Sequence, residues 1–154
     1  MSFDTPNGTR GARQPSGAIM RWVNDRQVHR IRKKGGRGVV GLNALALTTV
    51  GARTGQERQA PVAWFPAPDG GWLISASAGG AARHPAWYHN LAAHPDRVRI
   101  DVDGESYDVV AEQLHGEERE RAWAQIVAAA PRFNGYTTKT DREIPVIHLR
   151  RKAG

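Results

Sequence analysis

The chain of 154 residues can form one sizeable hydrophobic core but has little room for a second folding unit, so one domain is expected. Hydrophobic residues make up 40% and charged residues 24% of the sequence, which is typical of a globular protein. The lack of cysteine excludes disulfide bonds, thiolate metal ligands and a cysteine nucleophile. No apolar run approaches the roughly 18 residues of a membrane-spanning helix, and no signal-peptide core is present, so we expect a cytoplasmic protein.

The formal net charge of +7 comes from the N-terminal part of the chain. Residues 1–37 contain nine Lys or Arg and two acidic residues, whereas residues 38–154 contain thirteen of each. A basic arm of this kind attracts polyanions, which include nucleic acid, an anionic membrane surface and an acidic cofactor tail. A solvated helix face is the simpler alternative. Nucleic-acid binding is the weakest interpretation, because the rest of the chain is neutral and has no recognisable docking motif.

The composition divides the chain into three parts. Residues 1–17 are rich in Gly, Pro, Ser, Asn and Arg, which predicts a disordered N-terminal tail. Residues 18–37 form a basic amphipathic segment, helical over about 18–34, whose apolar face either packs on the body or lies on a membrane surface. Residues 38–154 then form the folded, ligand-binding domain.

This domain reads as a series of short strands with few helices. We expect strands at residues 45–50, 58–65, 72–78, 97–102, 106–114 and 144–149, and helices at 84–94 and 117–130. Asp103-Gly104, between two alternating stretches, indicates a type I′ hairpin, and Pro145 suits the start of an edge strand. Residues 136–142 read as a hydroxyl-rich link between the last helix and the last strand. Consecutive hairpins predict a mainly β (α+β) fold, in which an antiparallel sheet closes into a small barrel with flanking helices.

Several kinds of site find little support in the sequence. The chain lacks the G-x-G-x-x-G and P-loop patterns of common nucleotide sites and the H-E-x-x-H and G-x-S-x-G patterns of hydrolases. His84, His89 and His94 are spaced by five residues, so on a helix their side chains point in different directions and do not converge on a metal. A zinc site and a hydrolase are therefore not expected.

Residues 48–56 (Thr-Thr-Val-Gly-Ala-Arg-Thr-Gly-Gln) form the first candidate site. Hydroxyl groups, a guanidinium and glycine-rich backbone amides are groups that bind phosphate oxygens, although a plain hairpin turn with an exposed Arg53 would look the same. A second cluster follows the third predicted strand, where Ser75, Ser77, Ala78 and Gly79 precede the helix at 84–94. Such a small-residue loop would let a flat ring approach the backbone.

These residues resemble those of the deazaflavin-dependent nitroreductase family of actinobacterial oxidoreductases. The resemblance covers most of the chain and depends on residues 47–55 (Leu-Thr-Thr-Val-Gly-Ala-Arg-Thr-Gly), 82–91 (Ala-Arg-His-Pro-Ala-Trp-Tyr-His-Asn-Leu) and 136–146 (Tyr-Thr-Thr-Lys-Thr-Asp-Arg-Glu-Ile-Pro-Val). It implies a split β-barrel of six or seven antiparallel strands, like that of the FMN-binding oxidases. It also implies a bound coenzyme F-420, which is an 8-hydroxy-5-deazaflavin with a lactyl phosphate and a polyglutamate tail.

The resemblance further implies which residues contact the cofactor. Arg53, Thr54, Gly55 and Gln56 should hold the phosphate, Ser77, Ala78 and Gly79 should line the deazaflavin, and Trp87, Tyr88 and Asn90 should stand behind them. The remaining cofactor-binding candidates are Thr48, Thr49, Gly51, Pro61, Ser75 and Leu91. Tyr136 looks like the tyrosine beside the substrate pocket, where it would donate a proton.

Two positions depart from the family pattern. Members often carry Lys or Arg near Gln56 and a further tyrosine near Phe133, so the phosphate affinity and the substrate pocket are expected to differ in this chain. The implied activity is hydride transfer from reduced F-420 to a planar conjugated acceptor such as a quinone or a nitroaromatic, by a protein that would form a homodimer. An FMN-dependent reductase and a protein that binds the deazaflavin without turnover remain alternatives.

Overall fold

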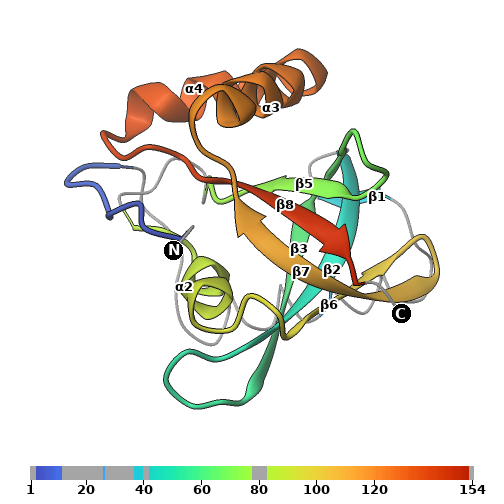
Figure 1. The fold of residues 1–154 in the computed structure, drawn as a ribbon. Helices are drawn as coiled ribbons and strands as arrows, with labels where there is room; N and C mark the ends of the chain where they lie inside the picture. The colour runs from blue at the N-terminus through green and yellow to red at the C-terminus, as the bar shows by residue number, and fades with distance from the viewer. Residues whose placement is uncertain (1–2, 12–25, 27–36, 40–41, 78–82, 153–154) are drawn as a thin grey trace.

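The computed structural model describes residues 3–11, 26, 37–39, 42–77 and 83–152, and Figure 1 shows their arrangement. The helix predicted at 18–34 lies outside the described residues except for Arg26, which is helical and exposed. No helix in the described part of the chain is long and apolar enough to cross a membrane.

Eight strands form one sheet in which every pairing is antiparallel. They are β1 (Arg37–Val39), β2 (Leu42–Val50), β3 (Glu57–Ala63), β4 (Phe65–Pro66), β5 (Trp72–Ser75), β6 (Val98–Val102), β7 (Glu105–Gln113) and β8 (Val146–Arg151). Their order is β1-β2-β6-β7-β8-β5-β4, and β3 also pairs with β2. The sheet curls into an incomplete barrel (Figure 1), which confirms the split-barrel fold class. The short strands β1 and β4 are additional to the six predicted.

Successive side chains along a strand point to opposite faces of the sheet, so the apolar residues form two separate hydrophobic clusters. Ile74 of β5 packs inside the barrel with Leu47 and Leu149, whereas the neighbouring Leu73 points to the other side of the sheet. There it meets Ile126 and Phe133, which come from the helices α3 (Gly116–Ala129) and α4 (Arg132–Lys139). Figure 1 shows these two helices together on one side of the sheet, while α2 (Ala86–Ala93) lies lower, beside β2.

Two local predictions are wrong. Residues 136–142 were expected to be a link, but α4 extends to Lys139, because Phe133 and Tyr136 give this weakly helix-forming sequence an apolar face that packs on the sheet. The last strand is also not an edge strand, since β8 lies between β7 and β5. Pro145 stands just before β8, where it needs no ladder donor, and its carbonyl accepts a hydrogen bond of 2.9 Å from the Ala76 amide.

Residues 3–11, which we name the N-terminal segment, pack against the body of the protein. The Phe3 ring lies 5.6 Å from that of Tyr88, and Asp141 accepts hydrogen bonds from the Thr9 and Arg10 amides. The sequence predicted disorder here, because the segment has few apolar residues. Its contacts are mostly backbone hydrogen bonds, which composition does not reveal. Residues 12–17 lie outside the described residues.

The β6–β7 turn and helix α4 give a matched test of glycine function. Asp103 and Gly104 have φ of 51° and 82°, as a type I′ turn requires, whereas a Cβ on Gly135 in α4 would meet open space. Gly104→Ala should lower the free energy of unfolding by about 1 kcal/mol, and Gly135→Ala should leave it unchanged or raise it by up to about 1 kcal/mol. Thermal unfolding of both variants measures this, and changes of the same sign would contradict it.

Candidate functional site

The loop between β2 and β3 is a compact turn with a row of exposed side chains. The Gly51 amide donates to the Gln56 carbonyl at 2.7 Å, and the Gly55 amide donates to the Gly51 carbonyl at 2.9 Å. Gly55 has φ of 72°, which favours glycine. The Arg53 and Thr54 amides have no hydrogen-bond acceptor among the described residues, and both side chains are exposed. Two adjacent amides and a guanidinium of this kind suit an anion.

Asn90 of α2 anchors this loop from beneath. Its side-chain oxygen accepts a hydrogen bond of 3.0 Å from the Ala52 amide, and its side-chain nitrogen donates to the Thr49 hydroxyl at 3.0 Å. Thr49 and Asn90 are both buried, and Leu91 beside them is a core residue. These predicted cofactor residues therefore position the loop rather than line an open surface, because their polar atoms already have protein partners.

Thr48 and Pro61 lie further along the same hairpin. Thr48 is buried, and its hydroxyl accepts a hydrogen bond of 3.4 Å from Gln59. Pro61 is half-buried and faces Ala46 across the β2–β3 pair. Both residues lie in the strands that carry the loop.

The end of β5 holds a hydroxyl group without a partner. Ser75 Oγ is buried and has no hydrogen-bond partner within the described part of the chain. It follows Leu73 by two residues, so it faces the α3 and α4 side of the sheet, where Tyr136 also lies. Ser77 is buried just beyond it, while Ala78 and Gly79 lie outside the described residues. A buried hydroxyl with a free hydrogen-bonding capacity suits a polar ligand atom.

Tyr88 has a different environment from the one expected for a cofactor residue. Its side chain is 2% exposed, and its hydroxyl donates to Gln113 at 2.6 Å and accepts from the Thr5 amide at 3.2 Å. Burial raises the pKa of the phenol. Tyr88 therefore joins α2 to β7 and the N-terminal segment, and Trp87 beside it is half-buried.

Tyr136 lies on α4, far along the sheet from the β2–β3 loop in the view of Figure 1. Its ring is half-buried, 5.3 Å from the Phe133 ring, with Lys139 Nζ 5.8 Å away. Phe133 itself is buried. Tyr136 thus lies beside a cation and on the side of the sheet that Leu73 of β5 faces, and α4 is well separated from the loop with Arg53 in Figure 1. A ligand that touches both must be elongated.

The sequence analysis missed two buried groups, Arg142 and His84. The Arg142 guanidinium donates to the carbonyls of Ala76 at 2.8 Å and Ser77 at 2.6 Å, and it lies 3.1 Å from His84 Nδ1. Burial lowers the pKa of both side chains. Nothing in the spacing indicates burial of either residue. The only signal is that both stand within the motifs quoted above.

The described residues contain no group of three or more histidine or acidic side chains that could hold a metal ion. The candidate site is therefore built from an anion-binding loop, a small-residue strand end with an unpaired hydroxyl, and a tyrosine. Its polar groups fit an elongated ligand with a phosphate at one end and a ring at the other.

Comparisons with known proteins identify the family of this chain. Residues 20–150 match the family model described as F-420H(2)-dependent quinone reductase. The chain is 41% identical over 140 residues to an F-420H(2)-dependent quinone reductase of Mycobacterium tuberculosis, which covers 88% of this chain and 87% of that protein.

Two solved structures are similar in sequence and fold. One, titled an F-420-H2 dependent reductase (FDR-A), has a TM-score of 0.63 and 38% identity, covering 70% of this chain and 93% of that one. Another, described as a domain-swapped dimer, has a TM-score of 0.64 and 36% identity, covering 86% of this chain and all of that one. The barrel fold thus has counterparts in both structures. The chain belongs to the F-420H(2)-dependent quinone reductase family.

Proposed function

We propose that this protein is an oxidoreductase that binds coenzyme F-420 and transfers a hydride from its reduced form to a planar conjugated acceptor, such as a quinone or a nitroaromatic. The observation that carries the proposal is the β2–β3 loop, in which Arg53 and two amides without an acceptor among the described residues stand on a buried support from Asn90. Membership of the family supplies the identity of the anion.

The loop residues suit the cofactor's phosphate. Arg53, Thr54, Gly55 and Gln56 are all exposed, and together they offer amides, a hydroxyl, a guanidinium and a side-chain amide. Asn90 and Thr49 fix the loop before any ligand arrives, so little ordering entropy is lost on binding. Gln56 in place of a cation leaves Arg53 as the loop's single positive charge.

The end of β5 suits the ring of the cofactor. Ser75 Oγ is buried and unpaired in the described structure, so an oxygen or nitrogen of the ring would give this hydroxyl the hydrogen-bond partner that it lacks there. Ser77, Ala78 and Gly79 carry small side chains that let a flat ring lie near the backbone. Trp87 and Tyr88 support this region from α2.

When bound, the reduced cofactor supplies a hydride from a ring carbon, so the protein needs no nucleophile of its own. The residues around Tyr136 then have to hold the acceptor and exclude water. Reduction of a quinone or nitro group also consumes protons at oxygen, and we assign the delivery of one to the Tyr136 hydroxyl on α4. Phe133 beside it cannot do so.

Two finer points remain proposals. A dimer is supported by the relative described as domain-swapped and would be measured by light scattering. The basic residues of 1–37 support contact with an anionic membrane surface, where a lipid-borne quinone would be found. Cosedimentation with vesicles that contain or lack anionic lipid tests this.

The phosphate loop is tested by Arg53→Ala with Arg58→Ala as its control, since Arg58 is an exposed arginine of β3 outside the loop. Loss of a charge-assisted contact to phosphate should raise the Kd for oxidised F-420 about 10-fold or more in Arg53→Ala only. Fluorescence titration measures both. Equal Kd values for the two variants would show that the loop does not bind the phosphate. Tighter binding of FMN than of F-420 would contradict the assignment of F-420 as the cofactor.

Proton delivery is tested by Tyr136→Phe with Tyr107→Phe as its control, since Tyr107 lies on β7 with its hydroxyl on Glu105. Without the phenol, protonation of the acceptor depends on water, so turnover of a quinone should fall roughly 10-fold or more. The Kd for F-420 should stay unchanged. Steady-state rates across a pH series measure this, and a Tyr136→Phe rate equal to that of the wild type at every pH would exclude the role.

A further inference from the structure

The Arg142 guanidinium is buried, with 6% of the residue exposed, and its partners include backbone carbonyls and a histidine nitrogen. One terminal nitrogen donates to the Ala76 carbonyl at 2.8 Å and the other to the Ser77 carbonyl at 2.6 Å. The first nitrogen also lies 3.1 Å from His84 Nδ1. Planar, forked donors let one side chain hold all three acceptors in a fixed arrangement.

These acceptors lie on two segments of the chain that are separated in sequence. Ala76 and Ser77 directly follow β5, which carries the unpaired Ser75 hydroxyl, and His84 directly precedes α2, which carries Asn90 and thereby the phosphate loop. Arg142 therefore sets the distance between the strand that suits the ring and the helix that supports the phosphate. Of the two carbonyls, that of Ser77 belongs to a residue proposed to line the ring of the cofactor.

His84 can accept from Arg142 only when Nδ1 carries no proton. Its other nitrogen, Nε2, must then donate, and it lies 2.8 Å from the Thr5 carbonyl and 3.1 Å from the Pro6 carbonyl. The His84 amide also donates to the Asn7 side chain at 2.9 Å. The N-terminal segment thus selects the tautomer that Arg142 needs.

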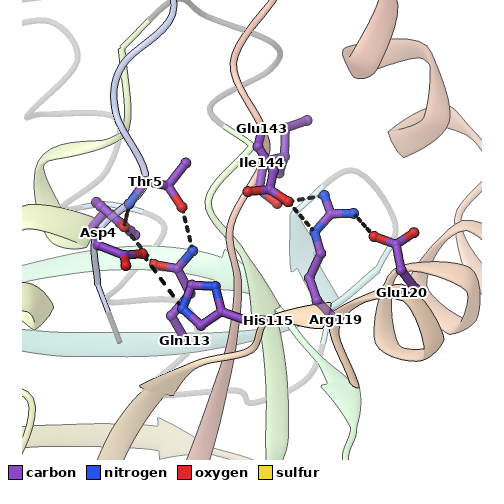
Figure 2. A network of polar contacts seen from close by, with 9 residues as sticks. Asp4, Thr5, Gln113, His115, Arg119, Glu120, Glu143 and Ile144 are labelled. Carbon is purple, nitrogen blue, oxygen red and sulfur yellow. Dashed lines mark hydrogen bonds and ion pairs between the residues drawn. The ribbon is translucent and has the colours of Figure 1, made fainter. Parts of the chain in front are cut away.

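The N-terminal segment is held at both ends. Figure 2 shows its Thr5 beside Gln113, which donates to the Thr5 hydroxyl at 2.7 Å, and its Asp4 near His115. At the other end, hydrogen bonds from Thr9 and Arg10 lower the pKa of Asp141 to about 2, so this carboxylate stays ionised beside Arg142. A Cβ on Gly8 would lie 2.8 Å from the Arg142 amide, so only glycine allows this approach.

We propose that Arg142 is a positioning residue of the cofactor site, which fixes the end of β5 against the start of α2, and that neutral His84, held by the N-terminal segment, is required for this. The inference rests on the proposed function. Loss of the guanidinium should weaken cofactor binding, because the backbone at Ala76 and Ser77 would lose the contacts that hold it.

The same geometry makes cofactor binding sensitive to acid. The charged or titratable groups that face His84 in the described structure are Arg142 and, from α2, His89 and Tyr88, while the N-terminal segment presents only carbonyls and Asn7. A proton on Nδ1 would remove the acceptor and place two cations in contact. Because burial holds the pKa of His84 below 6.5, the arrangement is intact above that pH and is lost as the pH falls through the lowered pKa.

The first experiment compares Arg142→Met and Arg142→Lys with Arg119→Met. Arg119 is a matched control, since it is also a largely buried arginine that donates to a backbone carbonyl, that of Ile144, and contacts Glu143, but it lies on α3 (Figure 2). Arg142→Met should raise the Kd for F-420 about 10-fold or more, Arg142→Lys should raise it less, and Arg119→Met should change it less than about 3-fold.

Hydrogen exchange of the cofactor-free proteins gives an independent measurement. Amides in peptides that cover residues 72–77 and 83–88 should exchange faster in Arg142→Met than in the wild type and in Arg119→Met. Unchanged exchange in these peptides, or a Kd increase no larger than that of Arg119→Met, would overturn the proposal. If the wild type fails to bind F-420, the proposed function is wrong, and this exchange still shows whether Arg142 fixes the two stretches.

The second experiment keeps the proposal testable if Arg142→Met does not fold. His84→Gln retains an acceptor and a donor but does not titrate, and His94→Gln at the C-cap of α2 is its control. The ratio of the wild-type Kd to the His84→Gln Kd should rise as the pH falls below 6.5, whereas the ratio to His94→Gln should stay constant. Titration of the cofactor itself changes the Kd of the wild type and of each variant by the same factor, so it cancels in these ratios. A constant ratio to His84→Gln would contradict the role of His84.

Discussion

A buried cation needs hydrogen-bond acceptors, and the Arg142 guanidinium has three of them in two backbone carbonyls and an imidazole nitrogen. Carbonyls cannot move without moving the chain, so the requirement of one side chain fixes stretches that are distant in sequence. The need for an acceptor also constrains His84, whose Nδ1 must carry no proton. Its Nε2 must then donate to the Thr5 carbonyl, because each hydrogen bond determines the protonation of the next group. The two ends of the candidate site therefore keep a constant separation before any ligand binds.

The fold could largely be predicted from the sequence, since its main elements have strong local signals. Alternation around Asp103-Gly104 gave β6 and β7 with their turn, and the spacing of Trp123 and Ile126 gave α3. Predictions failed where tertiary contacts decide. Helix α4 forms from weakly helical residues because Phe133 packs on Phe65, and β8 is central although Pro145 precedes it.

The candidate site could be predicted only in part, for a related physical reason. Arg53 to Gln56 were found because an anion-binding loop is local in sequence. The support of that loop by Asn90 involves residues far apart in the chain, and the resemblance placed Asn90 near the cofactor without showing this contact. Burial of Arg142 and His84 has no local signal, because charged and titratable residues are usually exposed.

The close approach of Gly8 to Arg142 has a consequence for the history of this chain. The family model begins at residue 20, whereas the groups that pair with His84, Tyr88 and Asp141 lie at residues 5–10. The barrel that matches the family model thus has docking points whose occupants lie outside the matched residues. Exchange of residues 3–11 alone would alter the surroundings of a buried histidine and so change the acid tolerance of the site without any change in the barrel sequence.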